Sequence, residues 1–123
     1  MVKLVYPLRR RRDLSREEFQ RYWRETHAPL VASHAETLRI RRYIQVHTDA
    51  TPLDDALRES RGGAVEPFDG VAELWWDSVE DLAAAQSSEA GAAAARELLA
   101  DEANFIDLEA SPVWLAQENV VVG

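Results

Sequence analysis

The pattern of apolar and polar positions predicts four strands along the chain. Apolar and β-branched or aromatic segments, separated by polar or turn-forming residues, occupy residues 2–8, 38–48, 68–77 and 112–122. In the second segment the side chains alternate, so Tyr43, Gln45 and His47 share one face of the strand. A polar row on a covered sheet indicates a wet cavity or a polar interface, and the alternation alone does not say which face is which.

The first helix is predicted to begin at a capping box. Ser15 is followed three residues later by Glu18, the spacing at which each side chain caps the backbone of the other. Phe19 and Trp23 then follow at helical spacing. Pro29 disfavours helical geometry at the residue before it, so the helix is predicted to kink or to restart near residues 26–29.

A second helix is predicted from Ser78, its N-cap, to about residue 100, through a run rich in alanine. Residues 101–111 are expected to form an irregular joint before the last strand. The connection over residues 49–67 is rich in Asp, Pro, Gly and Arg, with one short helix expected over 52–60. Long connections of this kind often serve as lids over binding sites.

The resulting order of elements is β-α-β-β-α-β. This order predicts an α+β, ferredoxin-like domain over residues 1–123, with an antiparallel four-stranded sheet and both helices on one face. The third and fourth strands are apolar on both of their faces, which is typical of strands covered on both sides. We therefore expect a two-fold homodimer in which a second copy covers the free face of the sheet.

Composition and charge exclude several classes of function. No cysteine is present, which excludes disulfides, thiolate metal sites and a cysteine nucleophile. The chain has a net charge of −8, with 11 Lys/Arg and 5 Asp/Glu in residues 1–48 against 3 and 17 in residues 49–123. We expect no nucleic-acid partner, because no dominant basic surface is present. The absence of a long apolar run and of a signal-peptide pattern predicts a cytoplasmic protein without a membrane partner.

Two histidines are candidates for proton transfer. His27 shares one helical face with Phe19 and Trp23, so it points toward the sheet at the end of the core stripe. It could act as a general acid or base at a pocket, or it could cap the kink as a structural residue. His47 ends the polar row of the second strand and could line a cavity or a polar interface. His34 is expected at the surface, and no metal site is expected, because no motif of metal-ligand spacing is present.

The third strand adds aromatic and acidic candidates for substrate binding. Trp75 and Trp76 are adjacent, so one should line the helix-side cavity and the other the dimer face. Glu73 shares the face of Trp75 and would need a cationic partner, for which Arg41 or Arg42 is expected. Together with Trp23 and Tyr43, these tryptophans would suit a flat aromatic ligand, and Phe105 is expected to close one end. No phosphate-binding loop or other cofactor motif is present, so no cofactor is expected.

The helix motif F-x-x-Y-W-x-x-x-H-A-P-L, met from Phe19 to Leu30, resembles the EthD family of the dimeric α+β barrel superfamily. The segments "RRYIQVH", "DGVAELWWDS" and "SPVWLAQENVVV" extend the resemblance over nearly the whole chain. The resemblance implies a ferredoxin-like fold, a homodimer and a pocket between the sheet and the helices of each protomer. Related barrels include aromatic polyketide cyclases, muconolactone isomerases and cofactor-free monooxygenases.

The leading hypothesis is therefore a small cofactor-free enzyme of the cyclase, isomerase or dehydratase kind. Its substrate would be an aromatic or polyketide-like metabolite. His27 and His47 would move protons, while Tyr43 and Gln45 would hold substrate oxygens. A non-catalytic small-molecule-binding accessory protein and a cofactor-free or haem-handling monooxygenase are the alternatives, because a fold alone does not decide its chemistry.

Overall fold

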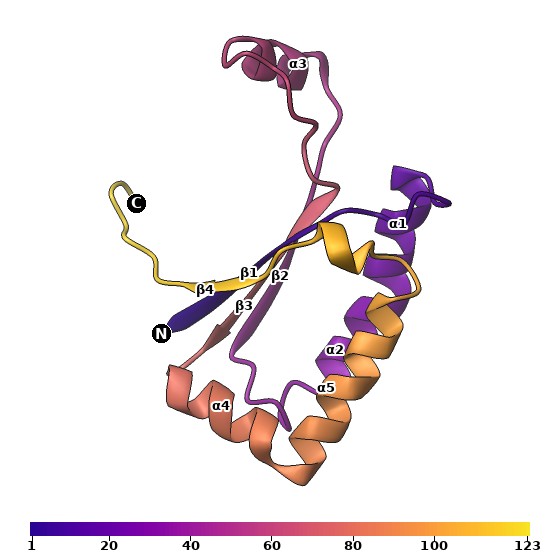
Figure 1. The fold of residues 1–123 in the computed structure, drawn as a ribbon. Coiled ribbons are helices and arrows are strands. Elements are labelled where there is room, and N and C mark those ends of the chain that lie inside the picture. Colours follow the sequence, from indigo (N-terminus) through magenta and orange to yellow (C-terminus); the bar gives the residue numbers. More distant parts are fainter.

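A computed structural model describes residues 1–123 and shows one antiparallel sheet with helices on one face (Figure 1). The sheet has the order β2-β3-β1-β4, the order of a ferredoxin-like fold. We call the face of the sheet that is turned away from the helices the outer face. The strands are β1 Val2–Leu8, β2 Arg42–His47, β3 Gly70–Trp76 and β4 Trp114–Ala116.

The register of the three central strands decides which side chains face the helices. Leu4 of β1 and Tyr43 of β2 both lie opposite Leu74 of β3, so these three side chains project from the same face. All three also line the cavity beneath the helices. The polar row of β2 therefore points toward the helices and not toward the outer face, which the alternation alone left open.

The N-terminal helical region runs through α1 Arg16–Tyr22, a π-helical turn η1 Trp23–His27, and α2 Ala28–Ser33. Both halves of the capping box are formed, since Ser15 accepts from the Glu18 amide and the Glu18 carboxylate accepts from the Ser15 amide. The predicted kink or restart takes the form of the wide turn η1, in which the amide of Ala28 donates to the carbonyl of Trp23, and the α-helix resumes at Ala28. Pro29 lies in the first turn of α2, where a helix needs no amide donor.

Three boundaries differ from those predicted. The second strand begins at Arg42, because Arg39 adopts a left-handed conformation (φ 58°) and turns the chain before it enters the sheet. The alanine-rich helix is two helices, α4 Val79–Ser87 and α5 Glu89–Glu102, because Ser88 is extended and caps the second. The last strand has only three residues, because the tail after Ala116 has no strand to pair with.

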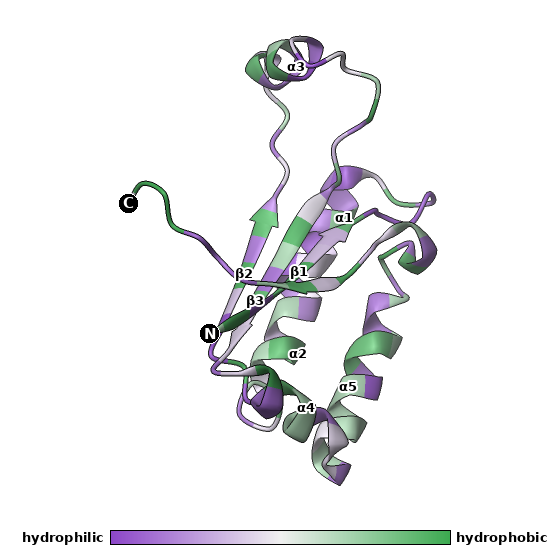
Figure 2. Cartoon of the chain, turned by 60° about the vertical axis from the view of Figure 1, so that its left-hand side comes forward, coloured by the Kyte–Doolittle hydropathy of each residue, from purple (hydrophilic) through white to green (hydrophobic).

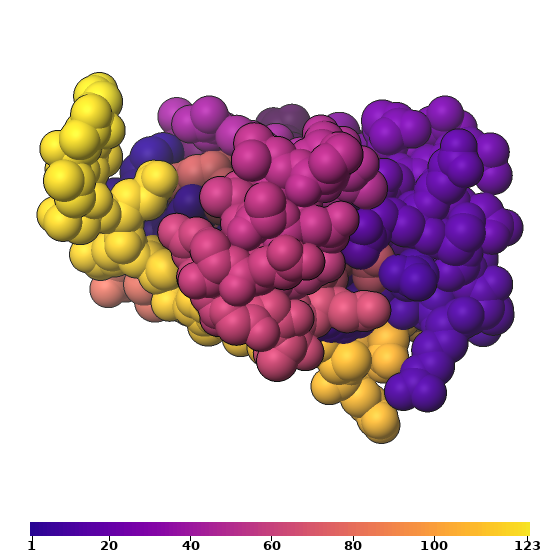
Figure 3. Space-filling model, turned by 90° about the horizontal axis from the view of Figure 1, so that it is seen from above, coloured from indigo at the N-terminus to yellow at the C-terminus, as the bar shows by residue number.

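The connection between β2 and β3 forms an arm that projects from the sheet and carries α3 Pro52–Glu59 (Figure 1). No residue of α3 is buried, and Leu53 and Leu57 are exposed. Seen from above, this arm lies across the top of the molecule, and the C-terminal tail stands clear at one side (Figure 3). No residue of the arm lines the cavity, so the structure does not place the predicted lid over it.

The core joins α1 and η1 to the sheet and to the segment after α5. Its fully buried residues are Leu8, Phe19, Trp23, Ala72, Phe105 and Ile106. Gly70 is required beside this core, because a Cβ there would overlap the ring of Trp23. The core therefore fixes Trp23, and with it the turn that carries His27, against the sheet.

A buried carboxylate holds the entry to α1 against the start of β3. Asp69 accepts from the backbone amide and guanidinium of Arg10 and from the guanidinium of Arg16. Burial alone would raise the pKa of Asp69, but these donors outweigh it and hold the pKa below its usual value. This contribution is present at neutral pH and is lost as the pH falls through the lowered pKa.

Asp69→Asn is expected to destabilise the fold by about 2 kcal/mol at neutral pH, because the guanidinium groups lose their charged acceptor. Urea unfolding of the variant and the parent at neutral pH and at low pH measures this effect. The difference should shrink at low pH, where the parent carboxylate is itself protonated. A difference that does not depend on pH would contradict the ionised state of Asp69.

No helix of this chain is both long and apolar enough to span a lipid bilayer.

Candidate functional site

A cavity of about 290 Å³ lies between the sheet and the helices. It is lined by 20 residues, of which 17 are hydrophobic, and the other three are His27, Gln86 and Glu102. Leu99 of α5 and Val113 before β4 also line it and are more than half exposed, so they mark its mouth. The cavity thus combines apolar walls with a few polar groups, the usual composition of a small-molecule site.

His27 is the buried histidine of this cavity, and a carboxylate fixes its orientation. Its Nδ1 lies 2.7 Å from Oδ2 of Asp101 on α5, and the residue is 5% exposed. An ionised carboxylate only accepts hydrogen bonds, so Nδ1 carries the proton. Nε2 then holds a lone pair and has no protein partner, yet it is not enclosed by protein atoms. It is therefore the nitrogen that a molecule in the cavity can reach.

The electrostatics favour a neutral His27 beside an ionised Asp101. Burial lowers the pKa of His27, although the Asp101 carboxylate partly opposes this by stabilising the imidazolium. Burial alone would raise the pKa of Asp101, but donation from Tyr22 and His27 outweighs it, so the pKa lies below its usual value. The Tyr22 hydroxyl donates to Asp101 at 2.6 Å and holds the carboxylate in place. This arrangement is that of a general base oriented by a carboxylate.

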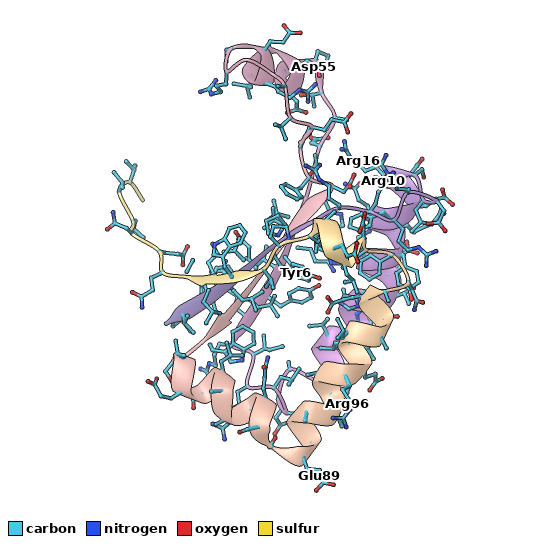
Figure 4. All side chains as sticks on the ribbon, viewed as in Figure 1. Tyr6, Arg10, Arg16, Asp55, Glu89 and Arg96 are labelled. Atoms are coloured by element: carbon cyan, nitrogen blue, oxygen red, sulfur yellow. The ribbon has the colours of Figure 1, made fainter.

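Glu102 follows Asp101 on α5 and, unlike Asp101, lines the cavity itself. The hydroxyl of Tyr6 on β1 donates to its Oε1 at 2.9 Å, and no cation lies within ion-pair distance. Tyr6 projects from the sheet toward α5 (Figure 4). Burial, and to a lesser degree the charge of Asp101, raise the pKa of Glu102 above its usual value, and the Tyr6 bond opposes this only in part.

Glu102→Gln is expected to stabilise the protein at neutral pH, because it removes a half-buried carboxylate without a cationic partner and keeps an oxygen that accepts from Tyr6. The pKa of Glu102 is raised by folding, so its ionisation favours the unfolded chain once the pH exceeds the usual pKa of glutamate. Thermal melts over a pH series should show a higher Tm for the variant at neutral pH and equal values at low pH. A lower Tm for the variant at neutral pH would contradict this account.

Of the polar row on β2, Tyr43 lines the cavity, whereas Gln45 and His47 lie behind its wall. Tyr43 lines the cavity, and its hydroxyl accepts from Nε2 of Gln45, which also donates to the Trp23 carbonyl. His47 donates from Nε2 to the side-chain oxygen of Gln45, and its ring lies 4.4 Å from that of Trp23. Neither Gln45 nor His47 is part of the lining, so the structure does not bring His47 to His27.

The two tryptophans of β3 face opposite ways. Trp76 lines the cavity, and its indole N–H donates to the Leu38 carbonyl. Trp75 lies on the outer face, where the side chains of Lys3 and Arg42 both lie over its ring. Its indole N–H donates to Glu118 of the C-terminal tail. Trp75 therefore does not reach the cavity of its own chain.

The predicted partner of Glu73 is wrong. Glu73 pairs with Lys3 of β1 at 3.1 Å, since these two side chains share the outer face on neighbouring strands. Arg41 lies before β2 and pairs with Asp77 instead, and Arg42 lies over Trp75. Glu73 is on the outer face with them and does not line the cavity.

Trp23, Phe105 and His34 complete the set of predicted residues. Trp23 lines the cavity and is 1% exposed. Phe105 is fully buried behind the lining, where its ring packs against those of Phe19, Tyr22 and His27. It therefore supports the His27 ring instead of closing the cavity. His34 is half-buried and lies 2.9 Å from a carboxylate oxygen of Glu97, outside the cavity.

Sequence reasoning missed Tyr6, Asp101 and Glu102. The sequence does contain a signal for Glu102. One helical face is formed by Ala95, Leu98, Leu99 and Glu102. A carboxylate on an otherwise apolar face is unusual and indicates a functional position. Predicting an irregular joint from residue 101 placed both acids outside the helix. No group of three or more His, Cys, Asp or Glu side chains has an arrangement that could hold a metal ion.

The sequence profile of the EthD domain matches residues 11–109. Among solved structures, an EthD family protein from Bacillus halodurans is 20% identical, with a TM-score of 0.63 over 97% of this chain and 99% of that chain. An EthD-like protein from Ralstonia eutropha is 21% identical, with a TM-score of 0.58 over 98% of this chain and 93% of that chain.

A third solved structure is described as a dimeric protein of unknown function with a ferredoxin-like fold, from Bacteroides fragilis. It is 12% identical, with a TM-score of 0.59 over 95% of each chain. No curated protein sequence matches this chain. The similarity to these structures supports the ferredoxin-like fold. The profile match over most of the length shows that the chain belongs to the EthD family.

Proposed function

We propose that the cavity is the site of cofactor-free proton transfer on an aromatic or polyketide-like metabolite. The observation that carries this proposal is the pairing of His27 with Asp101 beside apolar walls. A neutral imidazole with Nδ1 held by a carboxylate and Nε2 open to the cavity is suited to remove a proton from carbon or oxygen. His27 is the base, and Asp101 is a positioning residue.

The walls favour a flat and largely apolar ligand. Trp23, Tyr43 and Trp76 contribute aromatic surface, and leucines supply much of the rest. The volume of about 290 Å³ lies just below the usual range of small-molecule sites, about 300–1,000 Å³. The site therefore suits a ligand of two or three fused rings better than a long chain.

Cyclases, isomerases and dehydratases of polyketide-like compounds share one step, the removal of a proton from a carbon next to a carbonyl. This step needs a base and a group that stabilises the developing oxyanion, and it consumes no redox cofactor. His47 is not placed for this step in the present geometry, because Gln45 and Trp23 separate it from the cavity. We assign it a supporting role for the ring of Trp23.

Hydrogen–deuterium exchange of a model ketone tests this proposal without knowledge of the natural substrate. β-Tetralone is a fused bicyclic ketone with exchangeable protons next to its carbonyl. In deuterated buffer, NMR should show faster exchange with the protein than with buffer alone. Saturable binding without any acceleration would favour the non-catalytic binding protein, and oxygen uptake with formation of an oxidised product would favour the monooxygenase.

We propose further that the protein is a homodimer that buries the outer face of the sheet. Val46 and Trp114 are 44% and 48% exposed there, and the tail beyond β4 exposes Val120, Val121 and Val122. Figure 2 shows this apolar tail extended away from the body of the chain. A second copy would bury these side chains in a two-fold contact. The B. fragilis protein of similar fold is described as dimeric.

Light scattering is expected to give the mass of two chains for the parent protein. Val46→Asp places a charge on the outer face and should shift the protein to the mass of one chain. Val79→Asp is the matched control, because Val79 is similarly exposed (48%) but begins α4, away from the outer face. A parent protein with the mass of one chain at every concentration would contradict the dimer.

A further inference from the structure

Glu102 is the one acidic side chain that lines the cavity, and the role of His27 does not use it. It is held by Tyr6, and its neighbours in the cavity are apolar or uncharged. We propose that Glu102 is the proton donor of the site and that the substrate is a ketone or β-hydroxy ketone fused to an aromatic ring. This inference rests on the proposed function, to which it adds the acid and the substrate class.

The geometry supports a carboxylic acid instead of a carboxylate at this position. No lysine or arginine lines the cavity, and Glu102 forms no ion pair. Its single side-chain partner is the Tyr6 hydroxyl, which donates to one of its two oxygens. The second oxygen is free to carry a proton and to donate it to a ligand. A half-buried carboxyl group that faces an apolar cavity and has no cation nearby favours its neutral form.

The titratable groups around Glu102 come from three further elements. Tyr6 on β1 and Tyr43 on β2 are neutral phenols, and burial raises the pKa of both. His27 on η1 is neutral, since burial lowers its pKa. Asp101, adjacent on α5, is ionised, and its charge adds to the burial that disfavours a second carboxylate. Partial burial and the charge of Asp101 thus favour the protonated form of Glu102, and the hydrogen bond from Tyr6 opposes them only in part.

The two neighbouring acids of α5 thus take opposite roles. Asp101 turns toward donors, Tyr22 and His27, and is ionised. Glu102 lines the apolar cavity, where its raised pKa favours the neutral form. Two acids in contrasting environments are a known way for one site to supply both an ionised and a protonated carboxyl group. The cavity thereby holds a base, His27, and an acid, Glu102.

The reaction balances without a cofactor. The C–H bond next to the carbonyl breaks, its proton goes to Nε2 of His27, and its electron pair forms the C=C bond of an enol. The carbonyl oxygen takes the Glu102 proton. In a β-hydroxy ketone, the enol then reforms C=O, returns this proton to Glu102 and expels the hydroxyl group. The hydroxyl group leaves as water with the proton held by His27, so both residues regain their starting states.

Binding selectivity tests the donor independently of turnover. β-Tetralone and tetralin have similar shapes, and only the ketone can accept a hydrogen bond. Near neutral pH the protein should bind the ketone about fivefold to tenfold more tightly than tetralin, as expected for one hydrogen bond. The preference should disappear at alkaline pH, once Glu102 ionises. Fluorescence titration, using the tryptophans of the cavity wall, measures both affinities.

Two variants separate the donor from the fold. Glu102→Gln keeps a donor that does not titrate, so its ketone preference should persist at alkaline pH, while its exchange of β-tetralone should slow by about a hundredfold. Glu102→Leu removes the donor and should show no preference at any pH. Equal, pH-independent preferences in the parent and in Glu102→Leu would overturn the assignment of Glu102.

The outcomes also separate this inference from the proposed function. Suppose that the parent accelerates the exchange of β-tetralone, that His27→Ala does not, and that Glu102→Gln exchanges as fast as the parent. Glu102 is then not the proton donor, while His27 remains the base. If no protein accelerates exchange but the pH-dependent ketone preference is found, the proton-transfer function fails while Glu102 remains a neutral donor to a bound ketone.

Discussion

His27→Ala is expected to lower the protein-catalysed exchange of β-tetralone by about a thousandfold, which is typical of the loss of a general base. The substitution leaves most of the apolar lining in place, so the variant should still bind the ketone. Its exchange rate should approach that of buffer. NMR measurement of the remaining protonated ketone over time gives both rates.

His34→Ala is the matched control for this experiment. His34 follows α2, only seven residues after His27, but it faces Glu97 outside the cavity. Its substitution should leave the exchange rate unchanged. In the parent, burial lowers the pKa of His27, so the base form should persist below the usual pKa of histidine and the rate should fall only at lower pH. Equal rates for His27→Ala and the parent would show that another group is the base.

Gly91→Ala is expected to destabilise the fold by about 3 kcal/mol, because it overfills the corner between α4 and α5. A Cβ at this position would overlap the carbonyl of Ala85 and crowd the hydroxyl of Ser88, which caps α5. Backbone atoms cannot move aside as a side chain can. For a domain of this size the loss corresponds to a decrease in Tm of about 10 °C, which calorimetry can measure.

Ala90→Gly is the control at the neighbouring position. It changes the same turn by one methyl group but relieves no overlap, so it should cost at most about 1 kcal/mol, the helix propensity of glycine. The corner also sets the direction of α5, which carries Asp101 and Glu102 into the site. Gly91→Ala should therefore weaken ketone binding under conditions in which the variant is still folded. A fully stable Gly91→Ala would contradict the close approach at this corner.

The order of the elements and the inward face of the first helix could be predicted from local signals. The capping box at Ser15 begins α1, and the spacing of Phe19, Trp23 and His27 places all three toward the sheet, where all three are buried. These features depend on helical geometry and on neighbours a few residues away. They therefore need no knowledge of the rest of the fold.

The features that sequence reasoning missed depend on distant contacts. The apolar residues at 120–122 have strand-like composition, but no neighbouring strand is available to pair with them in this chain. The partner of Glu73 depended on the register of β1, which brings Lys3 to its side. The acids of the site are an exception, because the helical spacing from Ala95 to Glu102 is a local signal, and they were missed because the helix was predicted to end near residue 100.

The state of the His27 ring tests the central claim most directly. Nitrogen-15 NMR of histidine-labelled protein distinguishes the two neutral tautomers from the protonated ring and does not require turnover. We predict a neutral ring at neutral pH with the proton on Nδ1, and an Nε2 resonance that shifts when β-tetralone saturates the cavity. A protonated ring, a proton on Nε2, or an Nε2 resonance that does not respond to the ketone would contradict a base that faces this cavity.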